Sequence, residues 1–221
     1  MSDPIDSPRP AGDRKAKAVD AQTILDTAAD LIESVGVSGF SMRGLADELG
    51  VAVTSIYWHV GGRDKLFDSL VDQLLCQMAN LPVDGEDAIE RIRSLARAQR
   101  RVLIDRQHLL AIAHERDRTA ALFLPVQQAL AELLADLGMT GAKAALVLRA
   151  LQVHVISSAI MQFSAIRGAH HRHEEDPSLW DDSVPDRELV EALKAPTDYD
   201  AVFEYGLDGL VAPLRRSEQP G

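Results

Sequence analysis

A single glycine between two short helical segments constrains the fold of this chain more than any other feature. Ser41 is a good N-cap for a helix over residues 42–49, and the leucines of this helix are expected to face inward. Gly50 ends the helix with a left-handed cap, and a second short helix follows, up to about His59. Two helices joined by so tight a turn form the helix-turn-helix pattern, in which the earlier helices fix the angle at which the last one is presented.

The rest of the chain keeps a helical spacing of apolar residues, without the alternation that would indicate a strand. The first helix, over residues 20–35, has one apolar face, and Gly36 supplies its stop. That face is made of Ile24, Ala28, Leu31 and Val35. Further helices are expected over residues 63–79, 88–105, 107–114, 120–137, 143–166, 186–194 and 199–215. The prediction is an all-α fold of about nine to ten helices.

The length of 221 residues is enough for a small domain followed by a larger one. Residues 1–19, rich in Pro and Asp, are expected to be a disordered tail. Residues 20–80 then form the helix-turn-helix domain, which includes the long linking helix, and residues 81–216 form the larger helical domain. Within it, residues 168–185 are expected to be a mobile loop. The 46% of apolar and 26% of charged residues are typical of a soluble globular protein.

The charge of the chain gives no support to nucleic-acid binding. The net charge is −11, and residues 1–80, with 7 basic and 12 acidic side chains, contribute −5 of it. DNA-binding domains usually carry a basic surface, so DNA binding must be inferred from local pattern, with a modest contribution from counterion release. The lone Cys76 excludes an intramolecular disulfide and, with no signal peptide expected, favours the reducing cytoplasm.

The second short helix of the helix-turn-helix offers polar side chains to a DNA groove. Serine and threonine hydroxyls bond base edges or phosphates, and the threonine methyl group can touch thymine. Phosphate contacts commonly come from Tyr, His, Lys and Arg, and Arg63 and Lys65 stand at the start of the next helix. Tyr57 and Trp58 could instead pack in the core, but adjacent helical residues point about 100° apart, which fits one of them better than both.

This segment resembles the DNA-binding head of transcription regulators of the tetracycline-repressor (TetR) family. The run from Ser55 to Val60 is typical of the end of the family's recognition helix. The spacing matches the family without a gap at Phe40, Arg43, Leu45, Ala46, Leu49, Gly50, Val51, Tyr57, His59 and Leu66. The resemblance implies that operator DNA is contacted by Arg43, Val53, Thr54, Ser55, Tyr57, Trp58, His59 and Arg63. Lys65 is added to this set for its charge and its position at the start of the next helix. Val53 stands where the tetracycline repressor has glutamine, which implies a different operator sequence.

A weaker resemblance to the tetracycline-repressor subgroup lies in the last helix, at residues 203–208. In that subgroup the eighth and last helices of two chains form a four-helix dimer interface, so the resemblance implies a homodimer. The last helix carries one stripe of large residues and one of small residues, which suggests two buried faces. The residues expected at the interface are Phe203, Gly206, Leu207, Gly209 and Leu210.

The resemblance also implies a cavity for a small-molecule effector between the middle helices. The candidates to line it, several of which could equally be plain core, are His108, His114, Phe123, Gln127, His154, Met161 and Gln162. In the tetracycline repressor, the bound tetracycline–magnesium complex needs a histidine, a threonine three residues later and a carboxylate from the partner chain. Asp117 follows His114 where the threonine would be, and Gln162 takes the place of the carboxylate, so this complex is not expected to be the effector.

Three other interpretations have less support. A metal site at His170, His171 and His173 lacks a cysteine or a spaced second pair, so no metal or cofactor is expected. A membrane span over residues 144–166 would place Arg149 in lipid at a high cost, and a core helix covered on both sides fits better. An enzyme is not expected, because no nucleophile–base pair, metal set or phosphate loop has a diagnostic spacing.

The sequence therefore predicts a ligand-responsive transcription regulator that binds double-stranded DNA as a cytoplasmic homodimer. The favoured mechanism is a repressor that a small-molecule effector releases from a palindromic operator. A DNA-binding regulator without an effector, either constitutive or activating, stays open as the alternative. A packed second domain without a cavity would favour that alternative.

Overall fold

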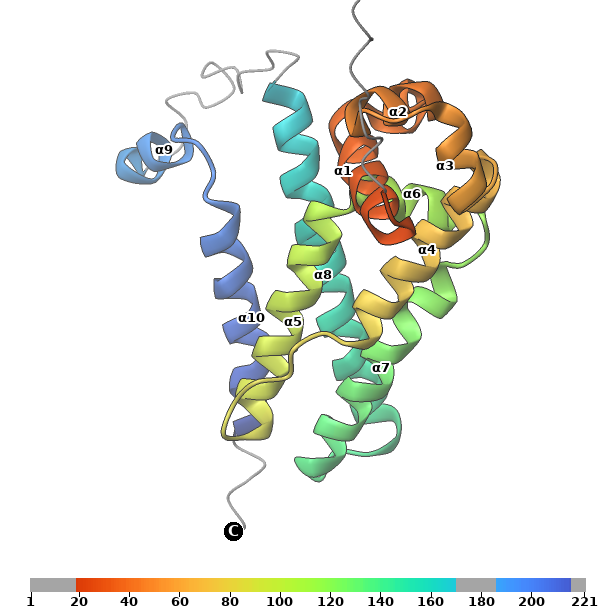
Figure 1. Ribbon diagram of the computed structural model, residues 1–221. Coiled ribbons are helices and arrows are strands. Elements are labelled where there is room, and N and C mark those ends of the chain that lie inside the picture. The colour runs from red at the N-terminus through yellow and green to blue at the C-terminus, as the bar shows by residue number, and fades with distance from the viewer. Residues whose placement is uncertain (1–18, 170–185, 216–221) are drawn as a thin grey trace, which may run out of the picture. The chain divides into compact units, whose positions relative to one another are not determined.

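The computed structural model describes residues 19–169 and 186–215, and within these ranges the chain forms ten α-helices and no strand (Figure 1). The helices are α1 (Ala21–Gly39), α2 (Met42–Leu49), α3 (Val53–Val60), α4 (Arg63–Ala79), α5 (Ala88–Asp105), α6 (Gln107–Glu115), α7 (Thr119–Asp136), α8 (Gly141–Ala169), α9 (Arg187–Leu193) and α10 (Tyr199–Arg215). The all-α prediction is confirmed, with a helix at each expected place. The histidines at 170, 171 and 173 lie outside the described residues, as does nearly all of the expected tail.

The chain divides into two compact units, Met1–Ser69 and Leu70–Gly221. The division falls inside α4, so this helix begins in the first unit and ends in the second. The first unit contains the helix-turn-helix, and the second contains the remaining helices from α5 onward. One unbroken helix is therefore the covalent connection between them.

Local capping sets the helix ends of the first unit. The Ser41 hydroxyl accepts the Gly44 N–H at 3.0 Å and caps α2. Gly50 adopts the left-handed conformation (φ 66°, ψ 31°), which costs a residue with a Cβ atom free energy, and turns the chain toward α3. At Gly36 the backbone of α1 leaves the helical region (φ 75°, ψ 164°), so the expected stop is a break, after which one more turn runs to Gly39.

The core of the first unit receives one or more apolar residues from each helix. Ile24 of α1, Leu45 of α2 and Ile56 of α3 are each at most 1% exposed. Phe40 packs against Phe67 of α4, with the ring centroids 5.7 Å apart. The expected inward direction is confirmed for Leu45, whereas Leu49 is only half-buried, and the contacts of Leu45 and Ile56 fix the angle of α3.

The buried face of α1 differs at its end from the expected one. Ile24 and Ala28 are buried as predicted, but Ala29 and Ile32 are the other buried residues of α1, Leu31 is half-buried, and Val35 is 48% exposed. Spacings of three and of four residues both keep a side chain on one helical face. The sequence pattern could not choose between them, and the packing of α2 and α3 against α1 made the choice.

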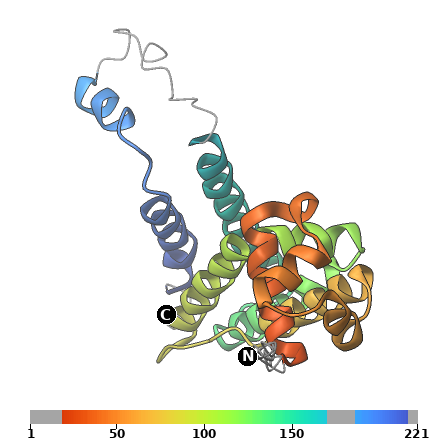
Figure 2. The same cartoon turned by 45° about the horizontal axis from the view of Figure 1, so that its top comes forward.

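In the second unit α8 packs against α5, α7 and α10, and α5 also packs against α7 and α10. Figures 1 and 2 show α5, α8 and α10 side by side. The core between them includes Leu95 of α5, Leu151 and Val155 of α8, and Phe203 and Leu207 of α10, each at most 2% exposed. Burial of each such side chain contributes about 1.5–3 kcal/mol, so the contact between these helices is fixed within a single chain.

The long helix α8 is covered on one side only. Among the described residues it is the one helix long and apolar enough to cross a membrane, over Gly141–Ala165, although the core helices of soluble proteins pass the same test. Only 17% of its most apolar stretch is buried, and Leu146, Val153 and Ile160 are 70%, 66% and 58% exposed. The expectation of a helix covered on both sides is wrong for the single chain, because no element of its described part covers this face.

Candidate nucleic-acid interface and ligand cavity

One residue anchors α3 while most of its other side chains face outward. Ile56 is fully buried, whereas its neighbours Tyr57 and Trp58 are 49% and 84% exposed. The other predicted DNA contacts of this helix range from half-buried to exposed, and they are Val53, Thr54, Ser55 and His59. Neither aromatic residue belongs to the core of the first unit. α3 thus carries hydroxyl groups, an imidazole and two polar-tipped aromatic rings on a free surface.

The first turn of α3 has no side-chain cap. Ala52 occupies the N-cap position, and no side chain bonds the N–H groups that the turn leaves over. The Ser55 N–H donates to the Ala52 carbonyl at 2.9 Å, while earlier N–H groups remain for water or an anion. Free N–H groups and the positive end of the helix dipole suit a phosphate oxygen, so this end of α3 can hold a DNA backbone.

Arg63 has a role in the fold as well as a predicted role at DNA. Its Nη2 atom donates to the Val37 carbonyl at 2.8 Å. Its guanidinium lies over the rings of Phe67 and Phe40, at 5.0 and 5.8 Å from their centroids. The residue therefore ties the start of α4 to the end of α1, and its predicted phosphate contact stays a prediction.

An open hollow of about 590 Å³ lies beside the end of α3, between the beginnings of α1 and α4. Tyr57, Trp58, His59 and Lys65 all line it, so four of the predicted DNA contacts share one surface. At the start of α1, the backbone N–H and then the hydroxyl of Thr23 lower the pKa of the Asp20 carboxyl, and the charge of His59 contributes less. This corner of the surface therefore combines a carboxylate with the two basic groups.

The helices around α3 carry few basic side chains, as the net charge of the sequence indicates. Residues 19–69 carry three basic side chains, Arg43, Arg63 and Lys65, against eight acidic ones. Arg43 and Lys65 are exposed, on α2 and α4. Attraction to DNA over a long range is accordingly weak, and any affinity must come from contacts in the groove.

A cavity of about 290 Å³ lies in the second unit, among α5, α6, α7 and α8. Nine of its twelve lining residues are apolar, namely Leu103, Leu110, Ala111, Leu122, Phe123, Ile156, Ala159, Ile160 and Phe163. The three polar ones are Gln107, His114 and Thr119, and none of the twelve carries a permanent charge. An apolar cavity with a few polar groups is typical of small-molecule sites.

Two of the seven expected cavity residues, His114 and Phe123, line this cavity. His108 stands behind it, with its ring edge-on to the Phe163 ring at 6.4 Å. Gln127 Nε2 donates to Gln152 Oε1 at 3.3 Å within the helical core. The placement of His108 follows from the helical turn, which points the neighbour of the lining residue Gln107 to another side.

The remaining three expected cavity residues lie elsewhere. Met161 is 60% exposed, on the outer side of α8. Gln162 accepts a short hydrogen bond from Arg100. His154 stacks on the Phe203 ring at 5.1 Å, and its Nε2 lies 2.9 Å from the Phe203 carbonyl. These three expectations are wrong for this cavity, because α8 turns these side chains away from α6 and α7.

Two of the three polar residues that line the cavity, Gln107 and Thr119, were not predicted from the sequence. Gln107 lines it, and its Oε1 atom is buried with no hydrogen-bond partner among the described residues. Thr119 Oγ1 lies 3.3 Å from His114 Nδ1. Gln107, Leu110 and His114 follow the helical spacing along α6, so a polar residue at each end of an apolar face was the available signal. No group of three potential metal ligands occurs within the described ranges.

Three arginines of α5 hold α10 in an antiparallel ladder. Arg97 forms two hydrogen bonds of 2.7 Å with the Glu204 carboxylate. Arg93 pairs with Asp208 one turn along. The Arg97 guanidinium lowers the pKa of Glu204, first through these hydrogen bonds and then through its charge. Partners more than a hundred residues apart in sequence are thus joined.

The third rung of the ladder is the buried Arg100. Its Nη1 donates to Asp200 at 2.6 Å and its Nε to the Ser158 hydroxyl at 2.8 Å. Its guanidinium also lies 4.6 Å from the centroid of the Phe203 ring. One side chain of α5 therefore fixes both α8 and α10.

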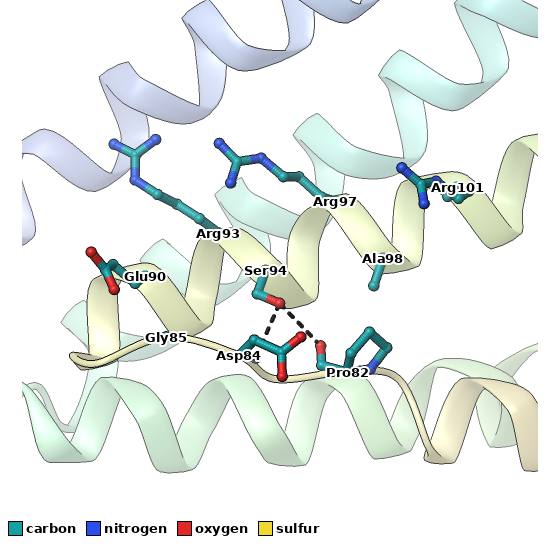
Figure 3. Close-up of a pocket in the computed structure, with 9 residues that line it drawn as sticks. All are labelled: Pro82, Asp84, Gly85, Glu90, Arg93, Ser94, Arg97, Ala98 and Arg101. Carbon is teal, nitrogen blue, oxygen red and sulfur yellow. Dashed lines mark hydrogen bonds between the residues drawn. The ribbon is translucent and has the colours of Figure 1, made fainter.

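An open groove of about 620 Å³ runs beside the ladder, between α5 and the segment that precedes it. Figure 3 shows Arg93, Arg97 and Arg101 projecting from α5, with Ser94 turned toward the preceding segment. The Ser94 hydroxyl accepts the Asp84 N–H at 3.1 Å and donates to the Pro82 carbonyl at 3.4 Å. Two of the three arginines are already paired with α10, so the groove serves the packing of this unit.

The expected dimer residues divide into two sets. Phe203 and Leu207 are 2% and 0% exposed within the chain itself, so they cannot face a partner, and these two expectations are wrong. Gly206 meets His154, whose Cε1 atom would lie 2.3 Å from a Cβ at this glycine. The small residue thus admits a histidine of the same chain. Gly209 is exposed and Leu210 half-buried.

A bare apolar surface nevertheless crosses α8 and α10. An open groove of about 560 Å³ runs along it, lined by Leu146, Arg149, Ala150, Val153, His154 and Ser157 of α8 and by Gly206 and Leu210 of α10. Val202 and Tyr205 of α10 are 57% and 85% exposed as well. The exposed residues at 146, 153 and 160 recur every seven positions, as at a helix–helix seam.

The cavity and α4 are linked by one ion pair. Arg118, which precedes the cavity residue Thr119, donates from its Nη2 to Asp72 of α4 at 2.8 Å. Both partners belong to the second unit. The turn between α6 and α7 is thus paired with α4, the helix that continues into the first unit.

Two family models cover most of the chain. The model of bacterial regulatory proteins of the tetR family matches residues 24–70, and that of the tetracyclin repressor-like C-terminal domain matches residues 81–217. Among curated relatives, the class C tetracycline repressor protein of Escherichia coli is 27% identical over 199 residues, which are 88% of this chain and 90% of that protein. These matches are to regulators of transcription.

Solved structures give the same result. Apo ActR from Streptomyces coelicolor is 28% identical, with a TM-score of 0.59, over 91% of this chain and 97% of that one. ActR in complex with actinorhodin is 26% identical, with a TM-score of 0.60, over 90% and 96% of the two chains.

Proposed function

The chain belongs to the TetR family of bacterial regulatory proteins, and we propose that it is a ligand-responsive repressor. It binds a palindromic operator as a homodimer in the cytoplasm and leaves the operator when a small molecule fills the cavity of the second unit. The observation that supports DNA binding most is the surface of α3. Ile56 anchors this helix in the core, while Tyr57 and Trp58, which directly follow it, stay exposed.

DNA recognition rests on the side chains of α3 with help from its neighbours. Thr54 and Ser55 read base edges, because a hydroxyl group can donate and accept. His59, Lys65 and Arg43 hold phosphates and so fix the register of the helix on the duplex. Few cations are available, so sequence reading contributes more than charge to the affinity.

The dimer rests on the bare apolar surface of α8 and α10. Aliphatic side chains such as Val153 and Ile160 are left in water by the fold of one chain. A second copy that covers the same face gives a symmetric interface, in which each residue meets its counterpart or a neighbour. Two copies also place two α3 helices at a fixed spacing, as a palindromic operator requires.

Release from DNA follows from the position of the cavity. A ligand that contacts His114 and Thr119 lies beside the turn that holds Arg118, and Arg118 is paired with Asp72 of α4. A small displacement of α4 changes the spacing of the two reading helices, to which a dimeric reader is sensitive. The similar ActR structure with actinorhodin supports a small-molecule effector in this fold.

Magnesium–tetracycline is not the effector in this proposal. The cavity offers one histidine and one threonine, but Gln162 takes the place of the carboxylate that the partner chain would supply, and a hard cation prefers carboxylate oxygens. Tight, magnesium-dependent binding of tetracycline in calorimetry would contradict this part.

Genomic footprinting of the purified protein tests the proposal as a whole. Protected sites should share a palindrome whose half-sites are about one helical turn of DNA apart, or a multiple of it. Genes beside these sites should rise in expression when the protein is deleted. Protection without a shared palindrome, or none at all, would overturn the proposal.

A further inference from the structure

The cavity of the second unit makes chemical demands on its ligand that go beyond the proposed function and rest on it. We infer that it takes an uncharged aromatic molecule that carries an O–H or N–H donor, and that Gln107 selects this donor. The inference follows from three properties of the lining, namely its charge, its one unpartnered acceptor and its aromatic rings.

The lining excludes a formal charge on the buried part of the ligand. No Asp, Glu, Lys or Arg is among the twelve residues that line the cavity. An ionised group without a counter-charge in such surroundings loses its hydration without compensation. His114, the one ionisable residue, is exposed and already lies 3.3 Å from the Thr119 hydroxyl, at the edge of the cavity.

Gln107 is the residue that requires a hydrogen-bond donor on the ligand. Its Oε1 atom is buried and has no hydrogen-bond partner among the described residues, although it belongs to a residue that lines the cavity. A buried carbonyl oxygen without a donor is unfavourable, and a ligand donor that meets it after a turn of the Gln107 side chain toward the cavity removes that deficit. A ligand without a donor leaves it in place, so the site discriminates between two molecules of the same shape.

Aromatic rings set the shape of the body. The Phe123 and Phe163 rings line the cavity, and His108 supports Phe163 from behind with an edge-on contact at 6.4 Å. Flat ligand rings stack on such faces or meet them edge-on. The volume of about 290 Å³ lies at the lower end of drug-sized pockets, so a body of one or two fused rings fits.

Calorimetry on the DNA-free dimer with naphthol, naphthalene and naphthoate tests the inference. The three probes share one ring system and differ in having a donor, no polar group or a charge. Naphthol should bind about tenfold more tightly than naphthalene, and naphthoate should bind most weakly. Naphthoate binding as tightly as naphthol, or no measurable binding of naphthol, would overturn the inference.

Two variants locate the site. Gln107→Leu should remove the preference for naphthol over naphthalene, while Gln128→Leu, the same change at an exposed glutamine of α7, should keep it. Ala111→Trp, at an exposed lining residue, should block all three probes without touching the core, and Ala131→Trp at an exposed residue outside the cavity should not. A preference that survives Gln107→Leu, or naphthol binding that survives Ala111→Trp, would refute the assignment.

The inference and the proposed function can fail separately. Probe binding is measured without DNA, so a chain that binds no operator but shows the naphthol preference loses the function and keeps the site chemistry. A chain that binds its operator but shows no such preference keeps the function and loses the chemistry.

Discussion

The helices α3 and α8 both leave one face bare, but the two faces are chemically different. α3 exposes Tyr57 and Trp58 beside hydroxyl and imidazole groups, whereas α8 exposes the aliphatic Leu146, Val153 and Ile160. Polar-tipped side chains on a short helix can stay in water until a hydrogen-bonding surface arrives. A row of aliphatic side chains is costly in water and requires apolar cover.

This difference shows that the exposed fraction of a side chain does not by itself identify the partner that covers it. A similar exposed fraction on the two helices fits DNA in one case and a second copy of the chain in the other, because the chemistry of the exposed atoms differs. The interactions that stabilise the fold inside each of the two units also differ. Short-range caps and a small apolar core stabilise the first unit, while the second adds arginine–carboxylate pairs between residues a hundred or more positions apart to a larger apolar core.

The largest effect is expected from a charge on the bare face of α8. Val153→Glu should turn the dimer into a monomer in sedimentation, because each interface would have to bury two carboxylates among aliphatic side chains. The dimer dissociation constant should rise by about a thousandfold or more. Leu124→Glu, at an exposed leucine of α7, is the matched control and should leave the dimer intact. A dimer that survives Val153→Glu would mean that this face has another use.

The second largest effect is expected on α3. Tyr57→Ala should weaken operator binding by about a hundredfold in a gel-shift assay, since both half-sites of the dimer lose a contact. The melting temperature and the dimer should be unchanged, because Tyr57 is half exposed. Val35→Ala removes an equally exposed side chain of the first unit and serves as control. Unchanged operator affinity would show that α3 is not the reading helix.

A smaller effect is expected from the link between the units. Arg118→Ala should lower operator affinity by about fivefold or less, because a partly exposed ion pair is worth under about 1 kcal/mol. Asp72→Asn should do the same, and the double variant should be no worse than either single one. Arg101→Ala, at an exposed arginine of α5, should have no effect. Additive losses in the double variant would show that the pair does not act as a unit.

The smallest effect concerns the arginine ladder of the second unit. The folded chain lowers the pKa of Glu204 below its ordinary value of 4.5, so the pair with Arg97 stabilises the fold above that pH and is lost as the pH falls through the folded pKa. Glu204→Gln should therefore reduce the free energy of unfolding at neutral pH by about 0.5–1 kcal/mol. The two proteins should become equally stable in strong acid, and Glu132→Gln should match the wild type throughout. A loss that persists in acid would assign the effect to packing.

Most of the fold could be predicted from the sequence because it rests on local signals. Ser41, Gly36 and Gly50 mark helix ends through a capping hydroxyl and through backbone conformations that glycine adopts easily. The exposed surface of α3 was also predictable, since one buried residue, Ile56, leaves its immediate neighbours on other sides of the helix. These features depend on residues within a few positions of one another.

Features that depend on which helix faces which could not be predicted. Helical spacing put Phe203 and Leu207 on one stripe, but the packing of α5 and α8 placed that stripe inside the chain and left Val202 and Tyr205 outside. Likewise the sequence made His154 a candidate for the cavity, yet α8 turns it toward Gly206. The helices and the helix-turn-helix follow from the sequence alone, because capping and periodicity act locally. The cavity and the bare face needed the structure, because a helix has several apolar sides and only its neighbours decide which are covered.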